Sequence, residues 1–254
     1  MANLISYVYD ITNNVEDGGW APMGITKLWC GSIPYDVVNP LAILWHSNMD
    51  PSVGYLAFHS TQGVMEWGID SVFVQTPYQF VDLPYCDHEG LCIHCGFDKA
   101  YNESGISRSL HEAMANTQLE TLFIAGHSLG GTLAVLAALD LTGKTTARVP
   151  LVSGNIHMNT FGAPHVGNQT FVAHVEKVHH NKIPTLMQYY SEDDMVLTSP
   201  LPCGVASTLL YEHVGDFMYF RSPQPSLAVS HSISNYLPYA RSVKLSSISA
   251  PKQQ

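Results

Sequence analysis

Strand-like and helix-like patterns of hydrophobic residues alternate through the middle of the chain. Short apolar runs lie at 121–125, 157–161 and 184–190, and patterns with helical spacing lie at 100–116, 129–141 and 168–179. Short continuous apolar runs are typical of strands buried on both faces. Their alternation with helices predicts an α/β fold, with a mainly parallel central sheet and helices on both of its faces.

Two further segments predict antiparallel hairpins at the edges of this sheet. Apolar runs at 41–46 and 54–59 flank the turn-rich sequence Asn-Met-Asp-Pro, and a second hairpin is expected at 207–221. A final helix follows position 231. No repeat or linker divides the chain, so we predict a single domain over residues 1–254.

The charge balance narrows the classes of function. The 254 residues include 11 Lys or Arg and 21 Asp or Glu, a formal net charge of −10. A surface that follows nucleic-acid phosphates needs clustered cations, and none is visible. Nucleic acid is therefore not an expected partner.

A second composition signal concerns membranes and location. Residues 121–139 carry no Asp, Glu, Lys or Arg, but glycines and a histidine at their centre favour a buried strand, a turn and a buried helix over a membrane span. The N-terminal sequence lacks the pattern of a secretory signal, and the five cysteines are an odd number. These features favour a cytoplasmic protein, with a mature secreted form as the alternative.

The sequence Gly126-His127-Ser128-Leu129-Gly130 is the first candidate for chemistry. It matches G-x-S-x-G and lies between a predicted apolar strand and a predicted apolar helix, where this motif turns sharply and exposes a nucleophilic serine. A serine needs a histidine and a carboxylate to activate it. In α/β-hydrolases these follow in the order serine, acid, histidine.

Several segments together resemble the fungal-type, class 3 triacylglycerol lipase family. They are FHSTQGVMEWGID (58–70), IHCGF (93–97), AGHSLGGTLA (125–134), NTFGAPHVGN (159–168), DMV (194–196) and HSISNY (231–236). They occur in the order found in the family. The resemblance implies an α/β-hydrolase fold and a serine ester hydrolase that cleaves acylglycerols.

Candidates for the acid and the base lie where the chain order requires them. Glu192, Asp193 and Asp194 follow the predicted strand 184–190. The family's Asp-x-Val pattern selects Asp194, with Asp193 as the alternative. Downstream of the acid stand two histidines, His213 and His231; the second opens the last helix and is followed by a tyrosine, as in the family's terminal histidine motif.

The tetrahedral intermediate of ester hydrolysis needs N–H donors. The backbone amide of Leu129, the residue after the nucleophile, is one candidate. The resemblance implies that Thr61 supplies the other, with Ser60 and Gln62 as alternatives. His59 and Ser60 stand where the family has Arg and Gly, which alters this turn.

Residues 62–73 show apolar positions at helical spacing, which predicts an amphipathic helix. The resemblance implies a lid that opens at a lipid surface and exposes acyl-binding side chains, while a fixed, packed helix is the alternative. Its candidate substrate-binding residues are Met65, Trp67, Ile69 and Phe73.

A cluster of cysteines and histidines invites a zinc interpretation. It consists of Cys86, His88, Cys92, His94 and Cys95. Structural zinc sites usually combine two separated ligand pairs, whereas these residues share one short loop. We therefore predict no metal; a disulfide between Cys86 and Cys92 is the expectation only under oxidising conditions.

Together these features predict a serine esterase that needs no cofactor and acts on a lipid or other ester, at a lipid–water interface in the lipase interpretation. The alternatives within enzymes are a phospholipase A1 and a feruloyl-type esterase, because a fold does not fix the substrate. The alternative from another class is a non-catalytic, lipase-like signalling module. No integral membrane segment is expected.

Overall fold

A computed structural model describes eight stretches of the chain: residues 24–32, 41–59, 75–77, 90–142, 152–194, 196, 211–222 and 230–242. The strands are β1 (Ile25–Gly31), β2 (Ala42–Ser47), β3 (Val53–Phe58), β4 (Gln75–Pro77), β5 (Cys92–His94), β6 (Thr121–His127), β7 (Asn155–Phe161), β8 (Thr185–Ser191) and β9 (Asp216–Phe220). The α-helices are α3 (Cys95–Asp98), α4 (Ile106–Met114), α5 (Leu129–Leu141), α6 (Gln169–Lys182) and α8 (Ile233–Ser242).

Seven strands form the central sheet, in the order β1-β2-β3-β6-β7-β8-β9. The first three pair antiparallel, and every pair from β3 to β9 is parallel. The expected mainly parallel sheet with an antiparallel edge is thus confirmed. At the other edge, the described residues do not form the antiparallel hairpin expected at 207–221: β9 runs parallel to β8, and Glu212 forms only an isolated bridge with Gly167. Residues 207–210 lie outside the described part of the chain.

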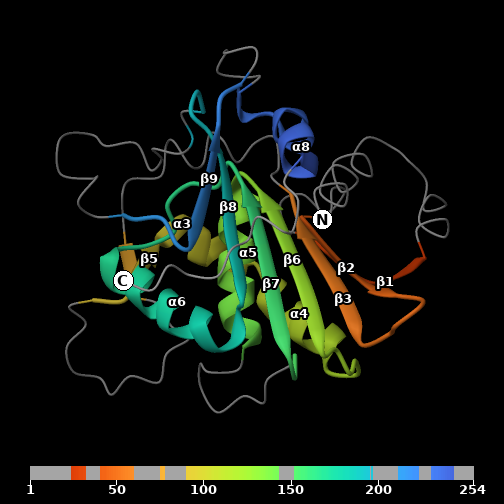
Figure 1. The fold of residues 1–254 in the computed structure, drawn as a ribbon. Helices are drawn as coiled ribbons and strands as arrows, with labels where there is room; N and C mark the ends of the chain where they lie inside the picture. Colours follow the sequence, from red (N-terminus) through yellow and green to blue (C-terminus); the bar gives the residue numbers. More distant parts are fainter. Residues whose placement is uncertain are drawn as a thin grey trace.

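Helices pack against both faces of this sheet, with α8 at one end of the second face. Strand side chains alternate between faces, and one set, including Leu122 and Ile124 of β6, packs with α4 and α5 in the larger core. Phe161 and Tyr189, from β7 and β8, pack with Tyr236 of α8 in a second cluster. In Figure 1 the strands pass in front of α5, while α8 lies beyond the upper end of the sheet.

Helix α5 explains the long charge-free stretch at 121–139. Every residue of this helix is buried, so an apolar surface all round it is what a helix inside a large core requires. Within the described part of the chain, no helix is long and apolar enough to cross a membrane. The strand, turn and helix predicted from this stretch are confirmed.

The helix expected over 100–116 is divided in two. A π-helical segment covers Lys99–Glu103, and α4 begins only at Ile106. Gly105 lies between them with φ +88°, a left-handed conformation that glycine adopts without steric cost. The glycine interrupts the regular helix, and the hydrophobic stripe of Ile106, Leu110 and Met114 begins only after it.

Several predicted site residues lie outside the described part of the chain. They are Ser60, Thr61, Gln62, the whole segment 62–73 with Met65, Trp67, Ile69 and Phe73, and also Cys86 and His88. The second oxyanion donor and the lid therefore stay predictions.

Candidate active site

Ser128 stands at a strained turn between β6 and α5. Its backbone angles are φ 56° and ψ −130°. Among the described residues it is the only non-glycine residue with a positive φ. Its N–H donates to the carbonyl oxygen of Phe161 over 3.0 Å, and its own carbonyl accepts from Gly131 N over 2.8 Å. This is the sharp strand-to-helix turn that G-x-S-x-G motifs adopt.

The glycines of the motif allow three backbones to meet at this turn. A Cβ on Gly126 would lie 2.0 Å from the carbonyl oxygen of Gly130, and one on Gly130 would lie 2.7 Å from the backbone of Phe58. Both distances are too short for any side chain. The small residues are therefore required because β6, the start of α5 and the end of β3 touch here.

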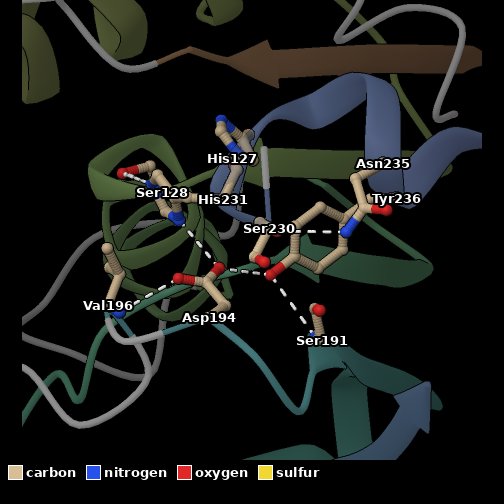
Figure 2. A network of polar contacts seen from close by, with 9 residues as sticks. All are labelled: His127, Ser128, Ser191, Asp194, Val196, Ser230, His231, Asn235 and Tyr236. Atoms are coloured by element: carbon tan, nitrogen blue, oxygen red, sulfur yellow. Dashed lines mark hydrogen bonds and ion pairs between the residues drawn. The ribbon is translucent and has the colours of Figure 1, made fainter. Parts of the chain in front are cut away.

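The structure brings Ser128, His231 and Asp194 into one hydrogen-bonded line (Figure 2). The Ser128 hydroxyl lies 2.7 Å from Nε2 of His231, whose Nδ1 lies 2.8 Å from Oδ2 of Asp194. All three residues are buried, with 4–8% of their surface exposed. The serine hydroxyl can donate to Nε2 if Nδ1–H donates to the carboxylate, which is the tautomer that proton abstraction needs.

The alternative residues considered from the sequence lie elsewhere. Asp193 Oδ2 accepts from the backbone N–H of Ser222 over 3.3 Å. His213 stacks on His165, with ring centroids 3.8 Å apart, and its Nδ1 lies 2.6 Å from the hydroxyl of Tyr190. Neither alternative bonds to the serine–histidine pair in the structure.

Asp194 is held as a carboxylate by its surroundings. Burial raises the pKa of this group, but the hydrogen bond and charge of His231, with bonds from Tyr236 and the Val196 N–H, outweigh burial and bring the pKa below its ordinary value. The Val196 N–H lies 3.0 Å from Oδ1. A charged acid in this position stabilises an imidazolium at His231.

Tyr236 is a site residue whose contact the sequence did not reveal. It marked the histidine motif, but in the structure its hydroxyl donates to Oδ2 of Asp194 and accepts from the N–H of Ser191 over 3.4 Å. Tyr236 is fully buried, and burial beside Asp194 raises the pKa of its phenol, so the phenol keeps its proton. Asp194 thus receives one bond from the histidine and one from a permanent donor.

Gly162 leaves the space in which this bond forms. It has φ +57°, and a Cβ there would lie 2.8 Å from the Tyr236 hydroxyl oxygen and 2.9 Å from Oδ2 of Asp194. The glycine belongs to the family-like segment NTFGAPHVGN. The segment contributes no reacting group, but its glycine leaves room for the bond between Tyr236 and Asp194.

We expect Gly162→Ala to lower kcat on p-nitrophenyl esters about tenfold or more, because the new methyl group pushes Tyr236 and Asp194 apart. Gly105→Ala is the matched control: its φ is also left-handed, but a Cβ there meets nothing within 4 Å. Both variants should lose about 1–2 kcal/mol of stability from backbone strain. Urea unfolding checks that both variants are folded. If folded Gly162→Ala and Gly105→Ala have equal kcat values, the role given to Gly162 is wrong.

The amide of Leu129 is the expected first oxyanion donor. Leu129 is the first residue of α5, and the N–H groups of a first helical turn point outward with a favourable dipole for negative charge. The contact between Gly130 and the backbone of Phe58 and His59 also places the end of β3 against this turn. The chain that leads from β3 to Thr61 therefore starts beside the nucleophile.

No group of three or more potential metal ligands occurs among the described residues. His94 has a local role there, because its Nδ1 accepts from the Gly96 N–H and caps α3. Cys92 and Cys95 are thiols, so Cys92 forms no disulfide in this structure. Burial raises the pKa of the Cys92 thiol, which makes it a poorer nucleophile and ligand at neutral pH.

Comparison with known proteins identifies the family of this chain. The family model for Lipase (class 3) matches residues 55–203, more than half of the chain. The chain therefore belongs to the class 3 lipase family. The match includes the serine turn and Asp194, while His231 lies beyond it.

Individual relatives have low sequence identity to this chain, but the matches extend over most of its length. The secreted mono- and diacylglycerol lipase A of Penicillium cyclopium is 28% identical over 184 residues, 70% of this chain and 50% of the relative. Lipase II from Rhizopus niveus has a TM-score of 0.61 at 22% identity, covering 88% of this chain and 79% of that one. The Rhizomucor miehei triacylglyceride lipase gives 0.60 at 20% identity, covering 85% and 79%.

These solved structures show the α/β-hydrolase fold predicted from the sequence. The chain spans about half the length of the curated Penicillium relatives that it matches. Those relatives are named secreted lipases. The expectation of a cytoplasmic location finds no support among them.

Proposed function

We propose that this protein is a serine carboxylic ester hydrolase that cleaves acylglycerols. The observation that carries the proposal is the line from Ser128 through His231 to Asp194, formed by residues that are 103 and 37 positions apart in the sequence. Membership of a lipase family, with relatives named mono- and diacylglycerol lipases, supports the substrate class.

In this mechanism the Ser128 oxygen attacks the ester carbonyl while Nε2 of His231 takes the hydroxyl proton. Asp194 holds the imidazole in the required tautomer and stabilises its positive charge. The Leu129 N–H donates to the oxyanion, and Thr61 is proposed as the second donor. The imidazolium then protonates the leaving alcohol, and a water molecule, activated by the same imidazole, releases the fatty acid from the acyl-enzyme.

Segment 62–73 is proposed as the lid of this site, with Met65, Trp67, Ile69 and Phe73 facing the acyl chain at a lipid–water interface. The enzyme alternatives, a phospholipase A1 and a feruloyl-type esterase, use the same serine chemistry. A panel of triacylglycerols, diacylglycerols, phospholipids and aryl esters, with and without an interface, separates them. Preference for diacylglycerol or triacylglycerol emulsions is the expected result.

A fluorophosphonate probe tests the proposal directly. We expect one mole of probe per mole of protein, bound covalently at Ser128, with loss of esterase activity in proportion to labelling. Peptide mass spectrometry locates the label, and heat-denatured protein is the control. A non-catalytic, lipase-like module would not react, so a folded protein that takes up no probe and hydrolyses no ester would refute the hydrolase assignment.

A further inference from the structure

His127, the residue directly before the nucleophile, contacts the backbone of the proposed general base. Its Nε2 lies 2.7 Å from the carbonyl oxygen of His231, and the two ring centroids are 4.9 Å apart. Because a carbonyl oxygen can only accept, Nε2 of His127 must carry a proton and donate it to this bond. The contact therefore fixes which nitrogen of His127 is protonated.

This hydrogen bond closes a ring that includes both reacting side chains. From His127 the ring runs along the backbone to Ser128, across the 2.7 Å bond from Oγ to His231 Nε2, and through His231 to its carbonyl oxygen. His231 is thus held at its side chain and at its main chain, by two consecutive residues of the turn. The main-chain contact limits movement of the His231 backbone while the imidazole bonds to serine and aspartate.

The surroundings of His127 keep it neutral. The pKa of His127 is lowered to about 3: burial and the neighbouring His231 and His59 lower it, and they outweigh the bond to the His231 carbonyl and the charge of Asp194, which raise it. The ring of Tyr236 lies edge-on, with centroids 5.9 Å apart. A second cation beside the imidazolium that forms at His231 during turnover would oppose proton transfer, and burial prevents it.

We propose that His127 is a positioning residue, which donates its Nε2–H to the His231 carbonyl and so holds the general base at bonding distance from Ser128. The inference rests on the proposed ester hydrolysis and assigns to this histidine a part of it that the serine motif does not specify. His127 touches no reacting atom; it acts through the backbone of His231.

Two substitutions separate positioning from packing. Gln in His127→Gln can place an amide N–H near the position of Nε2, whereas Phe in His127→Phe keeps a ring but offers no donor. We expect His127→Phe to lower kcat about ten- to a hundredfold with KM within about twofold, since the His231 carbonyl loses a buried donor. His127→Gln should keep kcat within about fivefold of the wild type. If the ring only fills space, this order reverses, and the reversal would overturn the proposal.

Nitrogen NMR of the His127 imidazole gives a readout that does not depend on turnover. We expect a proton on Nε2, coupled to the His231 carbonyl, and no titration between pH 7 and pH 5. Protonation of His127 in that range, or a bare Nε2, would overturn the inference even if the protein proved inactive. Wild-type protein without esterase activity, but with the expected His127 spectrum, would instead refute the proposed function alone.

The pH dependence of kcat/KM on its acid side is a kinetic test of whether His127 stays neutral. Since the pKa of His127 is lowered to about 3, this residue stays neutral between pH 7 and pH 5. It should therefore add no second proton to the acid limb, which is expected to depend on the first power of the proton concentration in the wild type and in His127→Gln alike. A second-power dependence that becomes first-power in His127→Gln would show that His127 itself titrates there, and would contradict the proposal.

Discussion

Ser128→Ala is expected to abolish ester hydrolysis, with kcat falling about 10⁴- to 10⁶-fold on p-nitrophenyl esters. The lost hydroxyl is the atom that forms the acyl-enzyme, and removing a nucleophile of this kind leaves only binding and oxyanion stabilisation. Alanine keeps the Cβ, so the φ of 56° at this position is no more strained than before. The folded state should therefore persist, as measured by urea unfolding.

A matched serine substitution makes this result specific. Ser109 lies in α4 and donates to the carbonyl oxygen of Ile106 in its own helix, so Ser109→Ala removes a hydroxyl far along the chain from the turn. We expect this variant to retain wild-type kcat within about twofold. If folded Ser128→Ala keeps more than a tenth of the activity, the proposed nucleophile is wrong.

The sequence predicted the parallel core of the fold well because its signals there are strong and local. The run at 121–125 lies within β6, and the helix expected at 129–141 coincides with α5. Both are almost wholly buried, so nearly every position had to be apolar. The small residues at Gly126 and Gly130 are imposed by backbone contacts at the turn, which made the motif visible in one short segment.

The site was only partly visible in the sequence because much of it depends on contacts between distant segments. The order serine, acid, histidine limited the base to His213 or His231, but only the fold shows that His213 faces Tyr190 instead. The bond from Tyr236 to Asp194 joins positions 42 apart. No periodicity encodes such a contact, and the space for it is provided by a third segment at Gly162.

The role of His127 was hidden for a related reason. In G-x-S-x-G this position accepts many residue types, so the motif gives no cause to examine it. Its partner is a backbone carbonyl 104 residues away, and a main-chain group has no sequence signature. Contacts to main-chain atoms are therefore where the structure adds most to the motif.

Asp194→Asn is expected to lower kcat about 10⁴-fold while the protein stays folded. An amide that turns its NH₂ toward Nδ1 of His231 would leave the proton of this ring on Nε2. A protonated Nε2 cannot accept the hydrogen bond, or the proton, of the Ser128 hydroxyl. The 2.8 Å contact would then hold the wrong tautomer. Asp193→Asn is the matched control, since its carboxylate accepts from Ser222 N–H, and we expect kcat within about threefold of the wild type.

The same pair of variants has an expected signature in stability. The pKa of Asp194 lies below its ordinary value in the folded protein, so as pH falls the unfolded chain binds this proton first, and the wild type loses stability from about pH 4 downward. Asp194→Asn should lack that loss, giving a flatter profile in urea unfolding at pH 5 to pH 3, whereas Asp193→Asn should follow the wild type. If Asp193→Asn instead removes both the activity and the acid sensitivity, then the neighbouring carboxylate is the acid, and His231 must turn toward it during the reaction.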